Sequence, residues 1–488
     1  MRNLITTNTT PIDARGNPYL EGPHGPTRDE IDAFDLDVIG DVPKDLDGIY
    51  LRNGPNQRVD PIGVHHWFDG DGMLHGVTIA DGKISYRNRW IRTEGLQAEE
   101  QAGHTIWPGI IDKPDRSLPQ AWGSDRNLKD ASNTDVVFHN GKAITTFYQC
   151  GDPYAVDPRT LETTGVLEVC DGGLRSMSAH NMVDEQTGEM MFFDYATRPP
   201  FMTYGVVDAN GHLSNHTEIE LPGARLPHTL AITRNYTILM DLPLFWDPEL
   251  LKQDAHKVQF HPDLPSRFGV IPRHGSGSEI RWFEAEPTYI YHIVNAWEDG
   301  DRIVLDGCKL GHPEPTQDER RRYAGPYASL MAWMKLDASY HRWIFDLRTG
   351  ACSEQRINDL ISEFPMINSS LNGERTRYSY HVSFADADTV LFDGLVKYDS
   401  ESGAVSRYKF PAGHFGSEAP FAPQTNGAAE DDGYVVTFVS IPAEQRAELQ
   451  VFDARNIEHG PLCRALIPNH IASGFHSCWI AGDRLHAG

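Results

Sequence analysis

The chain has 488 residues, of which 40% are hydrophobic and 10% aromatic, so it can bury one very large core or two to three ordinary ones. Its 69 Asp and Glu residues outnumber its 43 Lys and Arg residues and give a formal net charge of -26. A chain this acidic lacks the basic surface that phosphate backbones require, so we expect no nucleic-acid partner.

Residues 1–35 are predicted to be a polar leader on the outside of the fold. Neither this segment nor any later one contains an apolar stretch as long as a signal peptide or membrane helix needs. The sequence therefore predicts a cytoplasmic protein. It would reach an apolar substrate by partitioning, or by a transient membrane contact through a shallow apolar patch.

The first distinctive motifs are Leu-Arg-Asn-Gly-Pro-Asn-Gln at residues 51–57 and His-Trp-Phe-Asp-Gly-Asp-Gly-Met-Leu-His-Gly at residues 66–76. The two Asp-Gly steps predict a tight, turn-rich loop. Asp69 and Asp71 have the chemistry for acid-base work, but the glycine that follows each favours a turn role instead. The histidines of this region are interpreted as structural hydrogen-bonding residues.

Short apolar runs rich in β-branched and aromatic residues recur along the rest of the chain, separated by turns such as Asn140-Gly141. This pattern is typical of antiparallel β structure. Helical patterns are few: helices are predicted over Glu94–Ala102, Pro248–His256 and Asp318–Ala324, and a turn over Asn358–Ser362. No nucleotide-binding glycine motif follows a strand. No clean repeat is visible, so the residues alone indicate a large all-β domain, with which a propeller is compatible.

Four of the 22 histidines lie at the start or end of an apolar segment: His180, His228, His292 and His476. Such positions point a side chain inward at the rim of a β core. The four are far apart in the chain, and no local element forces them together. From the residues alone, each is more often a surface or hydrogen-bonded core histidine than a metal ligand.

Taken together, these motifs resemble the carotenoid cleavage oxygenase family, whose members use iron and dioxygen to split carbon-carbon double bonds. The resemblance spans residues 35 to 480. It implies an all-β fold, a seven-bladed β-propeller with a helical and loop cap over the metal centre, forming a single catalytic domain over residues 36–488. It also implies that the four histidines bind Fe(2+). An all-nitrogen ligand set suits zinc and copper as well, so iron follows from the resemblance and not from the ligands.

The resemblance also implies carboxylates that orient the ligands. Glu363 and Glu418 match residues that would accept the second ring N–H of His292 and His476, although either could otherwise be a solvated surface acid. The family's third such glutamate is missing, and its place falls on Tyr148 or Gln149. Each could accept the N–H of His228 as a neutral oxygen, which predicts a weaker hold on that ligand.

Other residues are candidates for the catalytic chamber. Thr134 matches a family threonine beside the oxygen site, where it would limit water. Aromatic side chains near the motifs are candidates for an apolar tunnel, with blade packing as the alternative for each. They are Trp67, Phe68, Trp107, Phe147 and Phe364.

Family members that cleave phenolic stilbenes use a lysine and an upstream tyrosine to hold the phenol. Here the lysine position is Phe147 or Tyr148, and residues 106–111 contain no tyrosine. We therefore expect a dioxygenase that cleaves a carotenoid or apocarotenoid alkene into two carbonyl products. The alternatives are cleavage of a phenolic stilbene or phenylpropene and, from other classes, an iron-dependent isomerase or a non-catalytic binding propeller. The oligomeric state is not predicted.

Overall fold

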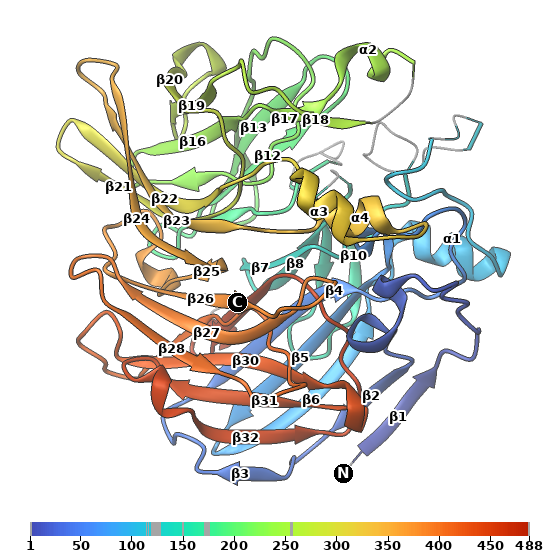
Figure 1. The fold of residues 1–488 in the computed structure, drawn as a ribbon. Coiled ribbons are helices and arrows are strands. Elements are labelled where there is room, and N and C mark those ends of the chain that lie inside the picture. The colour runs from blue at the N-terminus through green and yellow to red at the C-terminus, as the bar shows by residue number, and fades with distance from the viewer. Residues whose placement is uncertain are drawn as a thin grey trace.

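Seven antiparallel sheets of four to six strands surround a common axis in the computed structural model, which describes residues 2–113, 115, 117–118, 128–148, 151–169, 176–253 and 257–486 (Figure 1). Each sheet forms one blade of a propeller. A separate two-stranded hairpin lies beside the fourth blade. The predicted seven-bladed propeller is therefore confirmed.

The blades, each given from its innermost to its outermost strand, are as follows. Blade 1 is β33 (Ser477–Ala481), β4 (Gly48–Pro55), β5 (Gly72–Ala80), β6 (Lys83–Trp90), β2 (Asp29–Ala33) and β1 (Arg2–Thr7); blade 2 is β7 (Asp135–His139), β8 (Lys142–Thr146), β9 (Tyr154–Val156) and β10 (Thr163–Val166). Blade 3 is β11 (Met182–Val183), β12 (Met190–Tyr195), β13 (Met202–Val207) and β14 (Leu213–Glu218); blade 4 is β15 (Ala231–Ile232), β16 (Tyr236–Asp241), β19 (Ser266–Pro272) and β20 (Arg281–Ala285). Blade 5 is β21 (Ile290–Asp299), β22 (Arg302–Leu310), β23 (Ala338–Asp346) and β24 (Cys352–Ile361); blade 6 is β25 (Glu363–Met366), β26 (Tyr378–Phe384), β27 (Phe392–Asp399) and β28 (Val405–Lys409). Blade 7 is β29 (Phe421–Pro423), β30 (Gly433–Ile441), β31 (Arg446–Asp453), β32 (Pro461–Ile467) and β3 (Val38–Gly40), and the hairpin is β17 (Leu244–Trp246) with β18 (Val258–Phe260).

Burial follows the position of a strand within its blade. The second strand of blade 1, β4, is buried along its whole length, whereas the outermost strand of blade 3, β14, alternates between exposed and half-buried residues. A strand between two neighbours and two adjacent blades has no face left for water, whereas an edge strand keeps one solvated face. The core therefore lies between the blades, and polar residues gather at the periphery.

Two strands from opposite ends of the chain close the ring. The C-terminal strand β33 pairs with β4, with Ile480 opposite Ile49, while the N-terminal strand β3 pairs with β32. In Figure 1 the C-terminus accordingly lies inside the ring and the N-terminus at its outer edge. These two strand pairings tie the first blade to the last.

This closure predicts that Ile480→Ala destabilises the protein by about 3 kcal/mol, because the side chain is fully buried and its loss leaves a cavity. A lower midpoint of thermal unfolding would report it. Ile39→Ala is the matched control, since Ile39 lies on the other closing strand and is 49% exposed. Equal shifts for the two variants would contradict a specific role for the β33 core contact.

The helices agree in part with the sequence prediction. Helix α1 (Glu94–Ala102) has the predicted bounds: Thr93 caps it by accepting from Leu96 N at 3.0 Å, and it ends at the left-handed Gly103. Helix α3 (Gln317–Arg322) begins at a capping box. Helix α2 (Pro248–Leu251) is shorter than expected, and the last predicted residues lie outside the described part of the chain.

Two features differ from the sequence prediction. Helix α4 (Ala328–Trp333) was not predicted, although it covers the centre of the ring together with α3 (Figure 1). The predicted turn over Asn358–Ser362 is wrong, because these residues mostly continue β24 to Ile361, which pairs with Ser339 across a bulge in the ladder. At the bulge, Leu360 N donates to Oδ1 of Asn358 at 2.9 Å, so this polar side chain is hydrogen-bonded within the strand.

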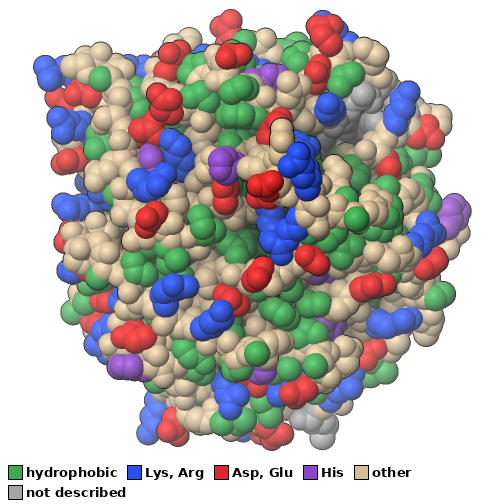
Figure 2. Space-filling view, viewed as in Figure 1, with side chains coloured by type: hydrophobic (Ala, Val, Ile, Leu, Met, Phe, Trp, Pro, Cys, Tyr) green, Lys and Arg blue, Asp and Glu red, His purple; other side chains and the backbone are tan. Residues whose placement is uncertain are grey.

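The N-terminal segment contributes to blade 1 as its outermost strands, β1 and β2. Ile31 in β2 is fully buried. The division of the chain at residue 35 stays a prediction. Across the described residues, no helix combines the length and apolar character needed to cross a bilayer. The face in Figure 2 carries acidic, basic and hydrophobic side chains interspersed with one another.

Candidate metal centre

Each blade contributes one of the predicted histidines, orienting glutamates or Thr134, and each of these lies at or near the start of an inner strand. They are Thr134 before β7, His180 before β11, His228 before β15, His292 in β21, Glu363 in β25, Glu418 before β29 and His476 before β33. The starts of the inner strands converge on the propeller axis. The fold therefore brings together side chains that are far apart in the sequence.

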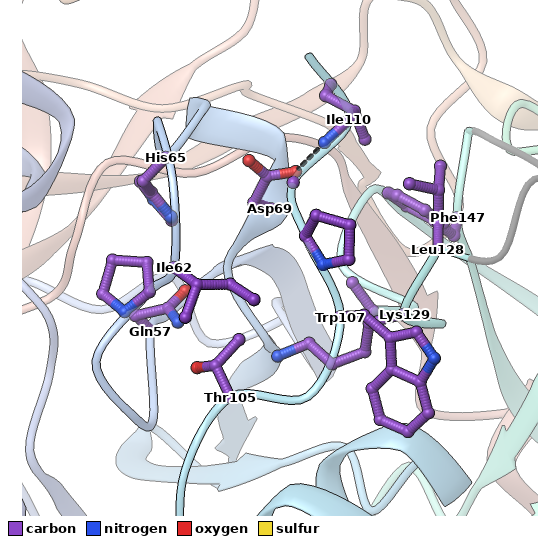
Figure 3. A pocket seen from close by; sticks show the side chains of 14 residues that line it. Gln57, Ile62, His65, Asp69, Thr105, Trp107, Ile110, Leu128, Lys129 and Phe147 are labelled. Carbon is purple, nitrogen blue, oxygen red and sulfur yellow. Dashed lines mark hydrogen bonds between the residues drawn. The ribbon is translucent and has the colours of Figure 1, made fainter. Parts of the chain in front are cut away.

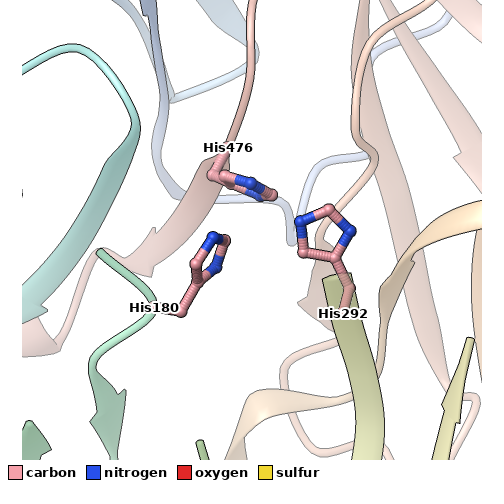
Figure 4. A group of neighbouring side chains, drawn as sticks. All are labelled: His180, His292 and His476. Atoms are coloured by element: carbon pink, nitrogen blue, oxygen red, sulfur yellow. The ribbon is translucent and has the colours of Figure 1, made fainter. Parts of the chain in front are cut away.

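The four histidine rings lie against one another at this point. The ring centroid of His180 is 4.6 Å from that of His228, 5.1 Å from that of His292 and 4.5 Å from that of His476. Figure 4 shows three of these rings converging from separate elements. One nitrogen of each of these three lies within 4.8 Å of the others, so the trio could hold a metal ion.

The backbone at His180 adopts a conformation that side chains rarely take. Its φ is 64°, in the left-handed region, and its N–H donates to Oδ2 of Asp135 at 3.0 Å. Asp135 also accepts from its neighbour Val136. Left-handed backbone costs of order 1 kcal/mol or more for residues with a Cβ. The Asp135 contact offsets this cost and fixes the direction of the imidazole.

Two buried glutamates orient two of the histidines. Nδ1 of His292 lies 2.6 Å from Oε2 of Glu363, and Nδ1 of His476 lies 3.0 Å from Oε1 of Glu418. Glu418 also accepts from the backbone N–H of Ser477. With Nδ1 engaged, each ring turns Nε2 toward the centre of the cluster. The Nε2 atoms of His180 and His292 are buried without a hydrogen-bond partner among the described residues, as a metal site requires.

The electrostatics of the cluster favour the neutral form of three of the four imidazoles. Burial lowers the pKa of His180, His228 and His292 well below the ordinary value, and neighbouring histidines add to the effect. Burial also acts to lower the pKa of His476, but the carboxylates around it, Glu418 foremost, outweigh burial and raise that pKa. Burial raises the pKa of Glu363 to about 8. A bound dication would favour its ionised form.

His228 lacks the hydrogen bond to a glutamate that His292 and His476 each have. Its Nδ1 is buried with no hydrogen-bond partner among the described residues. The Tyr148 ring lies 5.3 Å away and the Tyr291 ring 4.9 Å away, measured between centroids. Tyr148 therefore lies beside His228, where the resemblance places the missing glutamate. Gln149, the other candidate, lies outside the described residues.

Thr134 connects His476 with Tyr148 through hydrogen bonds. Its carbonyl accepts from His476 N at 3.3 Å, and its hydroxyl accepts from Tyr148 N at 3.2 Å and donates to Asn133 at 3.0 Å. The hydroxyl is thus occupied by protein partners. Thr134 also lines the cavity described next.

A cavity of about 950 Å³ opens from the histidines toward the cap. Of the predicted aromatic residues, Trp67, Phe68 and Phe364 line it, together with His228, His292 and His476. Phe364 packs directly on the rings of His292 and His476, with centroids 4.7 and 4.9 Å away. Sequence reasoning missed several lining residues: Tyr291, Phe475, Leu330 and Trp333. Phe475 and Tyr291 had a usable signal, since each directly precedes a candidate ligand.

Trp107 and Phe147 lie elsewhere. They line a separate cavity of about 30 Å³ beside Lys129 and Asp69 (Figure 3). Phe147 and Tyr148 follow directly after β8, and of the two only Tyr148 lines the large cavity. Trp107 and Phe147 therefore do not line the cavity that contains the histidines, and their part in a substrate tunnel stays a prediction with blade packing as its alternative.

Asp69 ties the loop bearing Ile110 to the entry motif, accepting from Ile110 N at 2.8 Å and His66 N at 2.7 Å (Figure 3). Burial raises the pKa of Asp69 to about 7. Since the folded state then holds a proton that the unfolded state loses near pH 4, this group's contribution to stability is full below pH 4 and is lost as the pH rises to 7.

We therefore expect Asp69→Asn to gain stability relative to the parent protein by about 1 kcal/mol between pH 4 and 7, a figure discounted for partial exposure. Urea unfolding at a series of pH values measures the difference. Asp208→Asn is a control, since Asp208 is a surface carboxylate whose pKa is lowered by the backbone N–H of His212. A stability difference that stays constant with pH for Asp69→Asn would refute the assignment.

The fold is a seven-bladed propeller whose axis carries a histidine cluster that could hold a metal ion. A family model described as retinal pigment epithelial membrane protein matches residues 24–481. The chain is 33% identical to a carotenoid 9,10(9',10')-cleavage dioxygenase from Crocus sativus, covering 96% of this chain and 90% of that protein. It is 32% identical to an isoeugenol monooxygenase from Pseudomonas nitroreducens, covering 96% and 98%. The chain belongs to the carotenoid cleavage oxygenase family, and it is an enzyme of that type.

Solved structures show the same fold. The lignostilbene dioxygenase of Pseudomonas brassicacearum superposes with a TM-score of 0.84 at 27% identity, covering 97% of this chain and 100% of that one. A cobalt-substituted apocarotenoid oxygenase from Synechocystis superposes with a TM-score of 0.79 at 26% identity, covering 93% and 96%. Relatives with different substrates thus share one architecture, and substrate choice must come from the residues that line the cavity.

Proposed function

We propose that this enzyme is a ferrous-iron dioxygenase that cleaves a C=C bond of a carotenoid or apocarotenoid into two carbonyl products. The observation that carries the proposal is the position of three of the four imidazoles at the base of the large cavity. One atom of dioxygen would enter each product as its carbonyl oxygen. The reaction then balances without a reductant or an organic cofactor.

The residues take the following roles. His180, His228, His292 and His476 hold the iron through neutral nitrogens, and the iron supplies the redox chemistry that lets dioxygen react with an alkene. Glu363 and Glu418 keep the Nδ1 protons of His292 and His476 in place, which fixes the tautomer of each ring. Thr134, with its hydroxyl engaged by protein atoms, offers little anchorage for water beside the oxygen site.

The walls of the cavity support an apolar substrate. Its volume of about 950 Å³ is at the upper end of the usual range for small-molecule sites. Aromatic rings of Trp67, Phe68 and Phe475 pack against one another there, with centroids 4.5 to 6.0 Å apart. A long, rigid polyene would bury most of its surface against such walls. Stilbene-cleaving relatives hold the phenol with a lysine and an upstream tyrosine. This chain has neither residue at the matching positions.

A second candidate is cleavage of a phenolic stilbene or phenylpropene. The similarity to a lignostilbene dioxygenase and to an isoeugenol monooxygenase favours it. Tyr148 and Tyr291 line the cavity near His228. Burial raises the pKa of Tyr291, so its hydroxyl stays protonated and able to donate to a phenol oxygen. This neutral hydrogen bond would take the place of the phenol-binding lysine and upstream tyrosine that the chain lacks.

The test is aerobic incubation of iron-loaded protein with a panel of apocarotenoids, stilbenes and propenylphenols under ¹⁸O-labelled dioxygen. Products are reduced at once to alcohols and analysed by mass. We expect label in both fragments of an apocarotenoid. Cleavage of the phenolic compounds alone would select the second candidate. Conversion without label would indicate an isomerase, and a protein that takes up no iron would indicate a binding module.

A further inference from the structure

A second cavity, of about 180 Å³, reaches the histidine cluster from another direction. His180, His292 and His476 line it, as do residues from the inner strands of several blades, among them Val136 to Phe138 in β7 and Ser477 to Trp479 in β33. Because only inner strands surround the propeller axis, this cavity runs along that axis. The large cavity instead runs beneath α4 and the β17–β18 hairpin. We call the smaller one the axial cavity.

The two cavities differ in chemistry. The carboxylates Asp135, Glu185 and Glu418 line the axial cavity, with the side chains of Asn181 and Ser369 nearby. The large cavity shares His292 and His476 with it and presents mostly aromatic and aliphatic groups, and its charged residues, Lys257, Glu314 and Arg320, include one carboxylate and two cations. A divalent cation that sheds water needs oxygen donors along its path, and carboxylates that outnumber the neighbouring cations suit it best. The axial cavity is therefore the passage suited to a cation.

An ion pair lies among the axial lining residues that are open to solvent. Arg484 Nη1 lies 2.5 Å from Oε1 of Glu185, and the two side chains are 30% and 21% exposed. Ser369 donates to the same glutamate oxygen at 2.9 Å. The Arg484 guanidinium lies 5.3 Å from the ring centroid of Phe138. Among the described residues that line this cavity, Arg484 is the one arginine or lysine, and it is placed where it opposes entry of another cation.

We propose that the axial cavity is the route by which a divalent cation reaches the four histidines, and that the Arg484–Glu185 pair controls its mouth. The proposal rests on the proposed metal centre but not on the substrate or the reaction. A cation enters when the pair opens, passes Glu185, and is drawn inward by Asp135 and Glu418 to the unpartnered Nε2 atoms. The alkene uses the other cavity, so metal loading and substrate binding do not compete for one path.

The two partners of the pair should have opposite effects. Arg484→Gln removes the repelling charge and leaves an attracting carboxylate, so uptake becomes faster. Glu185→Gln removes the attraction and leaves Arg484 unpaired, so uptake becomes slower. A pair that served only to stabilise the fold would give changes of the same sign for both variants. Charges that steer an approaching ion change association rates by about 10-fold or more at low salt.

The experiment measures Co(2+) uptake by chelator-treated protein in a stopped-flow spectrophotometer, through the visible absorbance of the bound ion. We expect uptake to be about 10-fold faster for Arg484→Gln and about 10-fold slower for Glu185→Gln at low salt, with both differences shrinking at high salt. The Arg377–Asp399 pair, also at 2.5 Å, lines neither cavity. Arg377→Gln and Asp399→Asn are therefore matched controls that should leave the rate unchanged.

A second arm fills the large cavity with trans-stilbene before cobalt is added. Unchanged uptake supports the axial route, and blocked uptake overturns it. Changes of the same sign for Arg484→Gln and Glu185→Gln, or no change in either, also overturn it. Protein that takes up no cobalt would refute the metal centre itself. Cobalt uptake together with an absence of alkene products would refute only the proposed reaction.

Discussion

Replacing His292 by alanine is expected to lower metal affinity by more than about 100-fold and to abolish alkene cleavage. Loss of a residue that merely orients a ligand typically costs 10- to 100-fold, and His292 is proposed as a ligand itself. Its Nε2 faces the cluster unpartnered, and its Nδ1 is held by Glu363. Metal analysis after dialysis against a weak chelator measures the loss directly, independently of any substrate.

Two comparison variants sharpen this result. Glu363→Gln keeps an acceptor for Nδ1 but loses the charge, so we expect an intermediate loss of about 10-fold in affinity. His381→Ala also removes a buried histidine, but Ser379 and Ser362 hydrogen-bond its ring away from the cluster. It should cost stability and keep the metal. Full metal content in His292→Ala would show that His292 is not a ligand.

Local sequence predicts the strands of the fold but not the number of blades. Apolar runs and turn dipeptides identify strands because burial and turn chemistry are local properties. The number of blades is hidden, since insertions interrupt the repeat unequally. The β17–β18 hairpin lies within blade 4, and α3 and α4 lie between β22 and β23 of blade 5. Helix α4 contains Met331 and Trp333 in a mixed pattern that gives no clear helical period.

The histidine site could not be predicted from the residues of this sequence alone. His180, His228, His292 and His476 meet because each precedes or begins an inner strand, and strand order across blades is a long-range property. Their quartet was expected only through the family resemblance, which the comparisons support. Asp135 escaped notice because its role depends on the left-handed backbone of His180, and φ cannot be read from residue type. The axial cavity likewise exists only once seven blades surround one axis.

Replacing Tyr148 by glutamate is expected to tighten metal binding by about 10- to 100-fold, the range associated with a hydrogen-bonding partner of a ligand. Nδ1 of His228 is buried and has no partner among the described residues, and Tyr148 is its neighbour in the large cavity. A carboxylate there would accept the Nδ1 proton, fix the ring, and add a negative charge close to the dication. The dication in turn offsets the cost of burying that charge.

Competition against a chelator of known affinity measures the gain. Tyr148→Phe is the matched control: it keeps the ring and removes the oxygen, so it should not tighten binding. If Gln149→Glu tightens binding and Tyr148→Glu does not, the missing acid belongs at residue 149. If neither variant tightens binding, the rings of Tyr148 and Tyr291 hold His228 well enough without a carboxylate. The absence of the glutamate would then mean that His228 is a ligand that moves during the reaction.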